Sequence, residues 1–240
     1  MSNQYFQFKK FKVQQDKSSM KVCTDSCLFG AWIAAALEQK NISAETILDI
    51  GTGTGLLSMM LGQKSDACID AVEIDINAFE QAKDNVGASP WHERIKLFHS
   101  NIKNFDPGLK YDLVISNPPF YENDLTAQDE GRNISKHSIA LSLEELIIIS
   151  KNLLSKDGTL AVLLPWHRTK LFEDVASKYS FFIKGKMQVK QTTSHNYFRT
   201  MLILTKTKSE TIETELTIKN SENNYSDEFK SLLKDYYLYL

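Results

Sequence analysis

The segment Tyr111–Phe120, YDLVISNPPF, combines an apolar run with side chains that can act on a planar amino group. Pro118 and Pro119 end the predicted strand, because proline has no N–H for a sheet ladder and fixes its own φ. The Asn117 amide, the Pro118 carbonyl and the Phe120 ring therefore stand together at a strand end. An amide oxygen and a carbonyl accept hydrogen bonds from an amino group, while the ring stacks on a flat base. An Asn-Pro-Pro is also a common turn, so other motifs must support this interpretation.

A glycine-rich turn and two polar residues at strand ends supply that support. The turn Gly51–Gly55, GTGTG, follows a predicted strand and precedes a helix, where glycine allows a ligand to approach the backbone. Its spacing is not the G-x-G-x-x-G of dinucleotide binders, and alone it is weak evidence. Glu73 ends the next strand, where an acid can hold both hydroxyls of a ribose. Asn101 follows the third strand and can hydrogen-bond an adenine edge.

Strands and helices alternate along most of the chain, which predicts an α/β fold with a mostly parallel, doubly wound, seven-stranded sheet and helices on both faces. The predicted strands are Thr46–Ile50, Ala67–Glu73, Arg94–Phe98, Tyr111–Ser116, Thr159–Leu164, Phe181–Val189 and Arg199–Lys206. The predicted helices are Leu28–Leu37, Ala78–Val86, Leu171–Tyr179 and one that Ser142 opens and Asp157-Gly158 ends. No helix separates the last two strands, so the last strand is expected to be antiparallel. The four motifs should then meet at the carboxyl edge of one sheet.

The ends of the chain complete a single predicted domain, 1–240. Residues 1–45 form a basic arm, with Phe6 and Phe8 alternating with polar residues, and a helix for which Thr24-Asp25 is a possible cap. Residues 46–206 form the core. Residues 207–240 add a short strand at Thr214–Lys219 and a final helix, DEFKSLLKDYYLYL, which Ser226 caps.

Composition and charge narrow the class of protein. With 42% hydrophobic and 24% charged residues and no apolar run of about 20 residues, the chain is expected to be globular and cytoplasmic. Three cysteines without a second Cys/His pair indicate buried thiols and no metal site. The net charge is −2, yet two acid-poor stretches suggest a local phosphate-binding surface. The lysines expected to bind RNA are Lys9, Lys10, Lys12, Lys184, Lys186 and Lys190.

These motifs together resemble the class I S-adenosylmethionine-dependent methyltransferases. ILDIGTGTG resembles the cofactor loop, AVEID the ribose-binding acid, HSNI the adenine-edge position and NPPF the catalytic motif. Asn101 is a departure, since many members carry Asp there. The resemblance implies S-adenosylmethionine as cofactor. It implies that the cofactor is bound by Thr24, Asp25, Asp49, Gly51, Thr52, Gly53, Gly55, Glu73, Ile74, Asn101, Ile102 and Asn117.

The flanks carry a more specific resemblance, to the bacterial tRNA1(Val) adenine-37 N6-methyltransferase family. FKKFKVQQDKSSMKVCTDSCLFGAW, SPWHERI and NNYSDEFKSLLKDYYL resemble that family, and the match covers nearly the whole chain. It implies methylation of adenine 37 in a tRNA anticodon loop, without a metal or a membrane, by the catalytic residues Asn117, Pro118, Pro119 and Phe120. Tyr121–Ala140 is the expected substrate loop. Thr24 and Asp25 would lie near the methionine end of the cofactor, and a helix cap is an equal alternative for Asp25.

Three other functions stay open from the sequence. One is methylation of a release-factor glutamine amide, although that family usually has Tyr after the two prolines and a helical N-terminal domain. Another is methylation of guanine N2 in ribosomal RNA. The third is a non-catalytic dinucleotide- or RNA-binding module, against which the intact Asn117–Phe120 motif argues.

Overall fold

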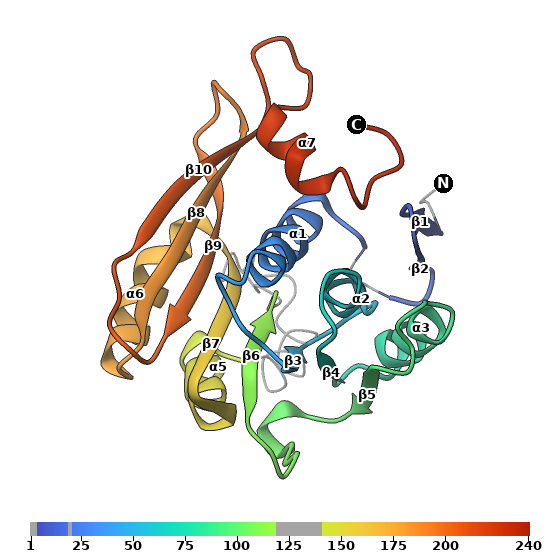
Figure 1. Ribbon diagram of the computed structural model, residues 1–240, viewed down its shortest axis with the longest axis vertical. Helices are drawn as coiled ribbons and strands as arrows, with labels where there is room; N and C mark the ends of the chain where they lie inside the picture. The colour runs from blue at the N-terminus through green and yellow to red at the C-terminus, as the bar shows by residue number, and fades with distance from the viewer. Residues whose placement is uncertain (1–3, 19–20, 119–140) are drawn as a thin grey trace, which may run out of the picture.

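An eight-stranded sheet forms the centre of the protein, with its strands in the order β10-β8-β9-β7-β6-β3-β4-β5 (Figure 1). The computed structural model describes residues 4–18, 21–118 and 141–240. The strands of the sheet are β3 (Thr46–Ile50), β4 (Cys68–Glu73), β5 (Ile95–His99), β6 (Tyr111–Ser116), β7 (Leu154–Pro165), β8 (Phe182–Thr192), β9 (Tyr197–Thr205) and β10 (Ile212–Lys219). A separate two-stranded sheet pairs β1 (Tyr5–Gln7) with β2 (Lys12–Gln14).

Of these eight strands, β9 alone runs antiparallel to its neighbours, β7 and β8. The connection from β8 to β9 spans only residues 193–196, which allows a hairpin but no crossover. The predicted seven-stranded sheet with an antiparallel last strand is therefore confirmed for β3 to β9. The short strand predicted at Thr214–Lys219 is also confirmed, and as β10 it pairs parallel with β8 at the edge of the sheet.

Helices cover both faces of the sheet, as predicted (Figure 1). One face packs against α1 (Thr24–Glu38), α2 (Leu56–Gly62), α3 (Ile76–Gly87) and α7 (Asp227–Leu233), and the other against α5 (Leu143–Leu153) and α6 (Thr169–Lys178). Two short 3-10 helices, η1 (Ile102–Asn104) and η2 (Trp166–Arg168), follow β5 and β7. Ile47 of β3 belongs to the apolar cluster under α1 and α2, and Leu48 belongs to the cluster under α5. This burial on both sides explains the continuous apolar run of the strand.

Two predicted helix ends differ from the structure. α1 begins at Thr24 after Cys23, which makes no side-chain capping bond, so the Thr24-Asp25 cap is wrong. Ser142 opens α5 with a capping box, as expected, but α5 ends at Leu153 rather than at Asp157-Gly158. Gly158 instead lies inside β7, where a Cβ would stand 2.8 Å from the carbonyl oxygen of Tyr111. Its glycine serves close strand approach and not a helix stop.

The C-terminal helix is shorter than predicted. The Ser226 hydroxyl accepts a hydrogen bond from the Phe229 N–H, which confirms the cap. α7 then ends at Leu233 and does not continue to the last residue, because the following tyrosines turn inward. The Tyr236 hydroxyl donates to the Met60 carbonyl over 3.0 Å, and Tyr237 forms a β-bridge with Phe8.

The N-terminal arm packs on the body of the protein. Phe8 and Val13 are fully buried, and the Asn85 side chain bonds both the N–H and the carbonyl of Gln14 at 2.8 Å. The same Asn85 amide donates to the Thr54 carbonyl over 2.9 Å. One buried side chain thus ties the arm to the glycine-rich turn, so the arm supports the region of the expected site.

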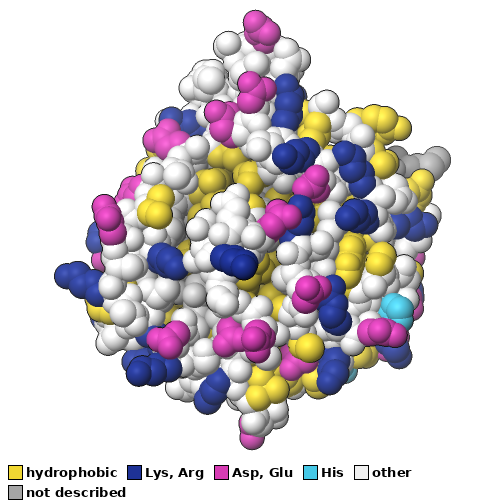
Figure 2. All heavy atoms as spheres, in the orientation of Figure 1, with side chains coloured by type: hydrophobic (Ala, Val, Ile, Leu, Met, Phe, Trp, Pro, Cys, Tyr) yellow, Lys and Arg dark blue, Asp and Glu magenta, His cyan; other side chains and the backbone are white. Residues whose placement is uncertain are grey.

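The surface carries charges of both signs. Figure 2 shows Lys and Arg side chains intermixed with Asp and Glu side chains on the face that it draws, in keeping with the net charge of −2. Cys27 is buried, but Cys23 and Cys68 are exposed, so the expectation of buried thiols holds only for the first. Within the described ranges, no helix has the length and apolar character needed to cross a membrane.

We expect Phe8→Ala to lower the free energy of unfolding by about 3–5 kcal/mol, because it removes a fully buried ring. Urea unfolding followed by circular dichroism measures the change. Tyr239→Ala is the control: Tyr239 is 87% exposed, and its loss should change stability by at most about 0.5 kcal/mol. An unchanged midpoint for Phe8→Ala would mean that the arm is detached in solution.

Candidate functional site

The strand order brings the sequence motifs to one edge of the sheet. β3 lies between β4 and β6 and is parallel to both, so the residues that follow these strands emerge on the same side. The chain moves away from β3 toward β4 and β5 in one direction and toward β6 and β7 in the other. Such a reversal of strand order opens a crevice at the carboxyl ends, where α/β sheets bind ligands.

Two glycines of the turn after β3 leave room for a ligand. Gly51 and Gly53 have φ values of +71° and +59°, and a Cβ added to either would meet nothing within 4 Å. Gly55, with φ +81°, has a different reason to be glycine, since its Cβ would lie 3.2 Å from Val86 Cγ2. The backbone of the first two is therefore open to close approach, whereas the third allows α3 to pack.

The Glu73 carboxylate is held beneath this turn at the end of β4. It is 8% exposed, and its Oε2 accepts from the Gly53 N–H over 2.8 Å. Its Oε1 accepts from the N–H groups of Ile74 and Asp75, each over 2.9 Å. A carboxylate offers about four acceptor positions, so capacity remains for ribose hydroxyls. Ile74 is exposed beside it.

Asp49, the last acid inside β3, is fully buried. Its Oδ2 accepts from the hydroxyls of Thr52 (2.6 Å) and Ser58 (2.7 Å), while Oδ1 has no hydrogen-bond partner among the described residues. Burial raises the pKa of this carboxyl to about 6, against the opposing hydrogen bonds. A buried carboxylate oxygen without a partner suits a cationic or hydrogen-bond-donating ligand group.

Asn101 and Ile102 lie after β5, at the far end of the same edge. The Asn101 side-chain oxygen accepts from the Lys103 N–H over 3.0 Å and so caps η1. Ile102 is buried at 9% exposure and belongs to the apolar cluster under α5. The Asn101 oxygen is therefore used locally.

The Asn117 side chain, after β6, is held by α1. Its amide nitrogen donates to the Ser26 hydroxyl over 2.8 Å, and that hydroxyl lies 2.9 Å from the Cys23 sulfur. This contact uses the donor of the amide and leaves its oxygen as the acceptor. Pro118 is buried. The predicted catalytic residues Pro119 and Phe120 lie outside the described residues, as does the expected substrate loop Tyr121–Ala140.

Asp25 makes an ion pair at the start of α1. Its Oδ2 accepts from Arg199 Nε of β9 over 2.6 Å, and its Oδ1 accepts from the Ser26 N–H over 3.1 Å. Thr24 and Asp25 also line a cavity of about 180 Å³ with Phe198. These contacts place both residues beside the Asn117 amide, through Ser26.

The lysines expected to bind RNA are distributed over the molecule. Lys190 lies near the carboxyl end of β8, with its ammonium 4.4 Å from the centre of the Tyr197 ring. Lys186 pairs with Glu173 at 2.9 Å, and Lys184 donates to the Asn41 carbonyl over 2.8 Å. Of these three, Lys190 is the one at the edge where Asn117 stands.

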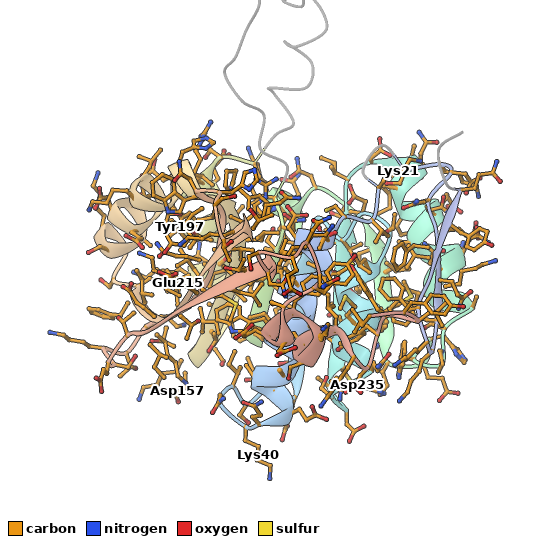
Figure 3. The ribbon with its side chains drawn as sticks, turned by 90° about the horizontal axis from the view of Figure 1, so that it is seen from above. Lys21, Lys40, Asp157, Tyr197, Glu215 and Asp235 are labelled. Atoms are coloured by element: carbon orange, nitrogen blue, oxygen red, sulfur yellow. The ribbon has the colours of Figure 1, made fainter. Side chains whose placement is uncertain are left out.

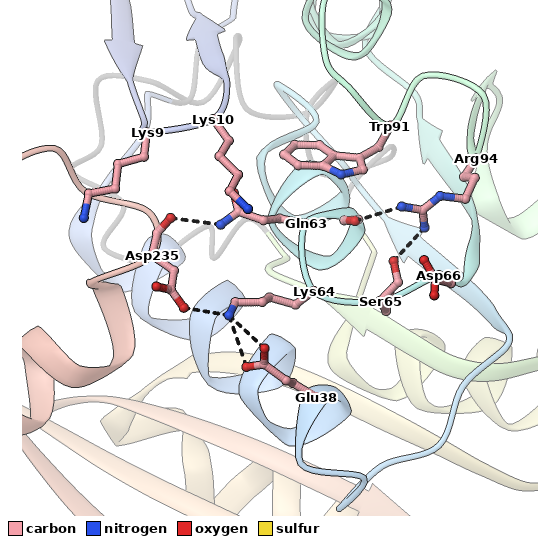
Figure 4. A pocket seen from close by; sticks show the side chains of 11 residues that line it. Lys9, Lys10, Glu38, Gln63, Lys64, Ser65, Asp66, Trp91, Arg94 and Asp235 are labelled. Carbon is pink, nitrogen blue, oxygen red and sulfur yellow. Dashed lines mark hydrogen bonds and ion pairs between the residues drawn. The ribbon is translucent and has the colours of Figure 1, made fainter.

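Lys9 and Lys10 line a cavity of about 580 Å³ (Figure 4). Asp235, which also lines it, lies toward the edge of the molecule opposite Tyr197 (Figure 3). Lys64 in this cavity is neutralised by Glu38 at 2.9 Å and Asp235 at 2.6 Å. The cavity is therefore separate from the edge that bears Asn117. Lys12, in β2, stands 4.8 Å from the centre of the Tyr5 ring.

Comparison with known proteins identifies this kind of site. The Methyltransferase small domain family matches residues 30–170. A tRNA1(Val) (adenine(37)-N6)-methyltransferase from Christiangramia forsetii is 41% identical over 245 residues, covering 100% of both chains. One from Parabacteroides distasonis is 37% identical, covering 99% of both. This chain belongs to the tRNA1(Val) (adenine(37)-N6)-methyltransferase family.

A solved structure supports the fold of the family member. A predicted O-methyltransferase from Agrobacterium tumefaciens superposes with a TM-score of 0.65 at 14% identity, covering 88% of this chain and 96% of its own. The fold is therefore the Rossmann-like class I methyltransferase fold, as the resemblance implied. The family resemblance read from the flanks is confirmed as well.

Three residues of this methyltransferase site were missed by the sequence analysis. Ser58 bonds Asp49, Ser26 bonds Asn117, and Arg199 bonds Asp25. Ser26 follows directly on Thr24-Asp25, a position that could have suggested it. Neither Ser58 nor Arg199 stands in a motif, and only the folded chain shows their partners.

We expect Asp49→Asn to change how stability depends on pH. The carboxyl binds its proton more tightly in the folded protein, because its pKa there is about 6 against an ordinary 3.8. That contribution is fully present below about pH 4 and is lost as the pH rises through 6. Relative to Asp49→Asn, the wild-type free energy of unfolding should therefore fall by about 3 kcal/mol between pH 4 and 7.

Urea unfolding at a series of pH values gives this difference, and constant costs of the substitution cancel from it. Asp157→Asn, an exposed acid at the opposite edge (Figure 3), is the control and should give a flat difference. A flat difference for Asp49→Asn as well would show that its carboxylate reaches water in the folded protein.

Proposed function

We propose that this protein transfers a methyl group from S-adenosylmethionine to N6 of adenine 37 in the anticodon loop of tRNA1(Val), in the cytoplasm. The observation that carries the proposal is the Asn117 amide, whose oxygen is left as an acceptor at the carboxyl edge by the bond to Ser26. The shared name of the relatives favours adenine over a glutamine amide or guanine N2.

The polar groups of the crevice fit this cofactor. The Glu73 carboxylate binds the ribose hydroxyls, and the open backbone at Gly51 and Gly53 lets the cofactor lie against the turn. The unpaired Oδ1 of Asp49 favours positive charge or a donor above it, such as an ammonium. The other residues proposed to line the cofactor are Thr24, Asp25, Thr52, Gly55, Ile74, Asn101, Ile102 and Asn117. S-adenosylmethionine supplies a methyl group already activated on a sulfonium.

Asn117 and Pro118 act on the amino group that is methylated. The N6 lone pair of adenine is delocalised into its ring, which makes it a poor nucleophile. The Asn117 oxygen and the Pro118 carbonyl accept hydrogen bonds from N6 and so favour a localised lone pair. They also stabilise the positive charge that develops on N6 during transfer. No dedicated base is required, because the methylated nitrogen is acidic and releases its proton.

The remaining motif residues hold the base. Pro119 stiffens the segment, and Phe120 stacks on the adenine, an interaction of about 1–3 kcal/mol per base. An anticodon-loop adenine is partly unpaired, which lowers the cost of moving it out of its stack.

The lysines contribute unequally to RNA binding in this proposal. Lys190 contacts the RNA near the reacting base, because it lies at the carboxyl edge. Lys184 and Lys186 are engaged by Asn41 and Glu173 and contribute less. Lys9, Lys10 and Lys12 belong to the packed arm, and they can reach only RNA that extends to other parts of the surface.

Asn117→Ala tests the chemistry. We expect kcat to fall by about 100-fold or more, while the dissociation constants for cofactor and tRNA change less than about twofold, since the lost contact acts on charge formed in transfer. Methyl transfer to a tRNA1(Val) transcript, with mass analysis of its nucleosides, measures this. Asn152→Ala, an exposed asparagine of α5, is the control. Equal losses in binding and rate would make Asn117 structural.

Glu73→Gln tests the cofactor assignment. We expect the dissociation constant for S-adenosylmethionine to rise about tenfold or more, because neutral amides bind hydroxyls less strongly than carboxylates do. Isothermal titration calorimetry measures it, with the exposed Glu210→Gln as control. Unchanged affinity at unchanged stability would remove Glu73 from the cofactor site.

A further inference from the structure

We infer that Trp166, Tyr197 and Lys190 form a stacking platform for a nucleotide that adjoins the target adenine in the RNA chain. The inference rests on the proposed function and adds a second contact for the substrate. These three residues, called the aromatic platform below, come from the segment after β7, the start of β9 and the end of β8.

The platform stands about one nucleotide away from the reacting base. β6 and β7 are parallel with Ser116 opposite Val162, so Asn117 lies level with Leu163. Trp166 follows three residues later on the neighbouring strand's path. With about 3.3 Å per residue and about 4.8 Å between strands, the backbones of Asn117 and Trp166 are on the order of 10 Å apart.

Trp166 has no role in the core. Its side chain is 44% exposed, which is unusual for the largest apolar residue unless the ring meets a ligand. The Trp166 and Tyr197 ring centres are 6.2 Å apart, with the planes tilted by 32°. Two neighbouring rings beside a catalytic edge are the arrangement on which unpaired bases stack.

A polar frame fixes the second ring. The Tyr197 hydroxyl donates to the Glu215 carboxylate, and Lys190 lies 3.5 Å from the same carboxylate (Figure 3 labels Tyr197 and Glu215). The Lys190 ammonium also stands 4.4 Å from the centre of the Tyr197 ring. Since hydroxyl, ammonium and carboxylate restrain one another, the ring is positioned before any ligand arrives.

The charges around the platform favour a nucleotide over a protein segment. Arg168 and the exposed His167 follow Trp166, while Arg199 is already paired with Asp25 and Lys190 with Glu215. The local excess of positive charge is small. Two rings with a few cations offer too little apolar area for a stable protein interface. Stacking is therefore the main interaction, and phosphate contacts are secondary.

The test compares Trp166→Ala with Trp166→Phe, using an anticodon stem-loop of tRNA1(Val) as substrate. We expect Trp166→Ala to raise KM for the RNA about tenfold, with kcat, cofactor affinity and the salt dependence of KM unchanged. Trp166→Phe should restore most of the affinity, because a phenyl ring still stacks. Tyr239→Ala, an exposed aromatic residue elsewhere, should change nothing. Equal thermal midpoints exclude misfolding.

A stem-loop with an abasic site beside adenine 37, on one side and then on the other, locates the stacked base. At one of the two positions the abasic substrate should raise the wild-type KM as Trp166→Ala does, and the two changes should not add. Full additivity at both positions, or an unchanged KM for Trp166→Ala, would overturn the platform while the wild type still methylates the RNA. If the wild type itself transfers no methyl group to adenine, the proposed function fails first.

Discussion

The parallel pairing of β3 with β4 and β6 is the constraint on which the site depends. Parallel strands bring their carboxyl ends to one edge, so the turn at Gly51, the carboxylate of Glu73 and the amide of Asn117 meet although they are far apart in sequence. An antiparallel partner on either side of β3 would send one of these groups to the opposite edge. The antiparallel strand of the sheet, β9, lies outside this group and leaves the three strands undisturbed.

Burial of the Asp49 carboxylate shows what the site costs the fold. An acid inside a strand is unfavourable, and only the hydroxyls of Thr52 and Ser58 support its charge. Glu73 adds a second negative charge that raises the pKa of Asp49 further. Such a pair is tolerated because the surrounding strands are fully apolar and hold the turn rigid. The remaining electrostatic demand of the two acids is met by a ligand that brings positive charge to the crevice.

Local patterns predicted the elements well, because periodicity and capping are local. The apolar run of β3, the Ser142 cap and the Ser226 cap all follow from neighbouring residues. The contacts that finish the site are not local. Ser26 and Asn117 are 91 positions apart, and Asp25 and Arg199 are 174 apart, so no repeat or spacing encodes them.

The errors at element ends have a similar cause. The pair Asp157-Gly158 has the chemistry of a helix stop, but tertiary packing used its glycine for the approach of β7 to β6. The Thr24-Asp25 pair has the chemistry of a cap, but the Asp25 carboxylate found a cation on β9 instead. In both places a long-range contact prevailed over a local preference, which a reading of the sequence cannot weigh.

The distribution of charge separates stability from recognition. Lys64, Lys186 and Arg94 are committed to carboxylates or carbonyls inside the fold, so much of the basic character of the sequence serves structure. At the carboxyl edge, Arg199 and Lys190 each face an acid, which leaves little net charge to attract phosphates. Long-range steering of an RNA is then weak, and salt affects binding modestly. Discrimination must come from contacts that form only when an unpaired base enters the edge: acceptors for its amino group and rings for its face. An enzyme built this way favours a loop over a duplex, because a paired base presents neither group.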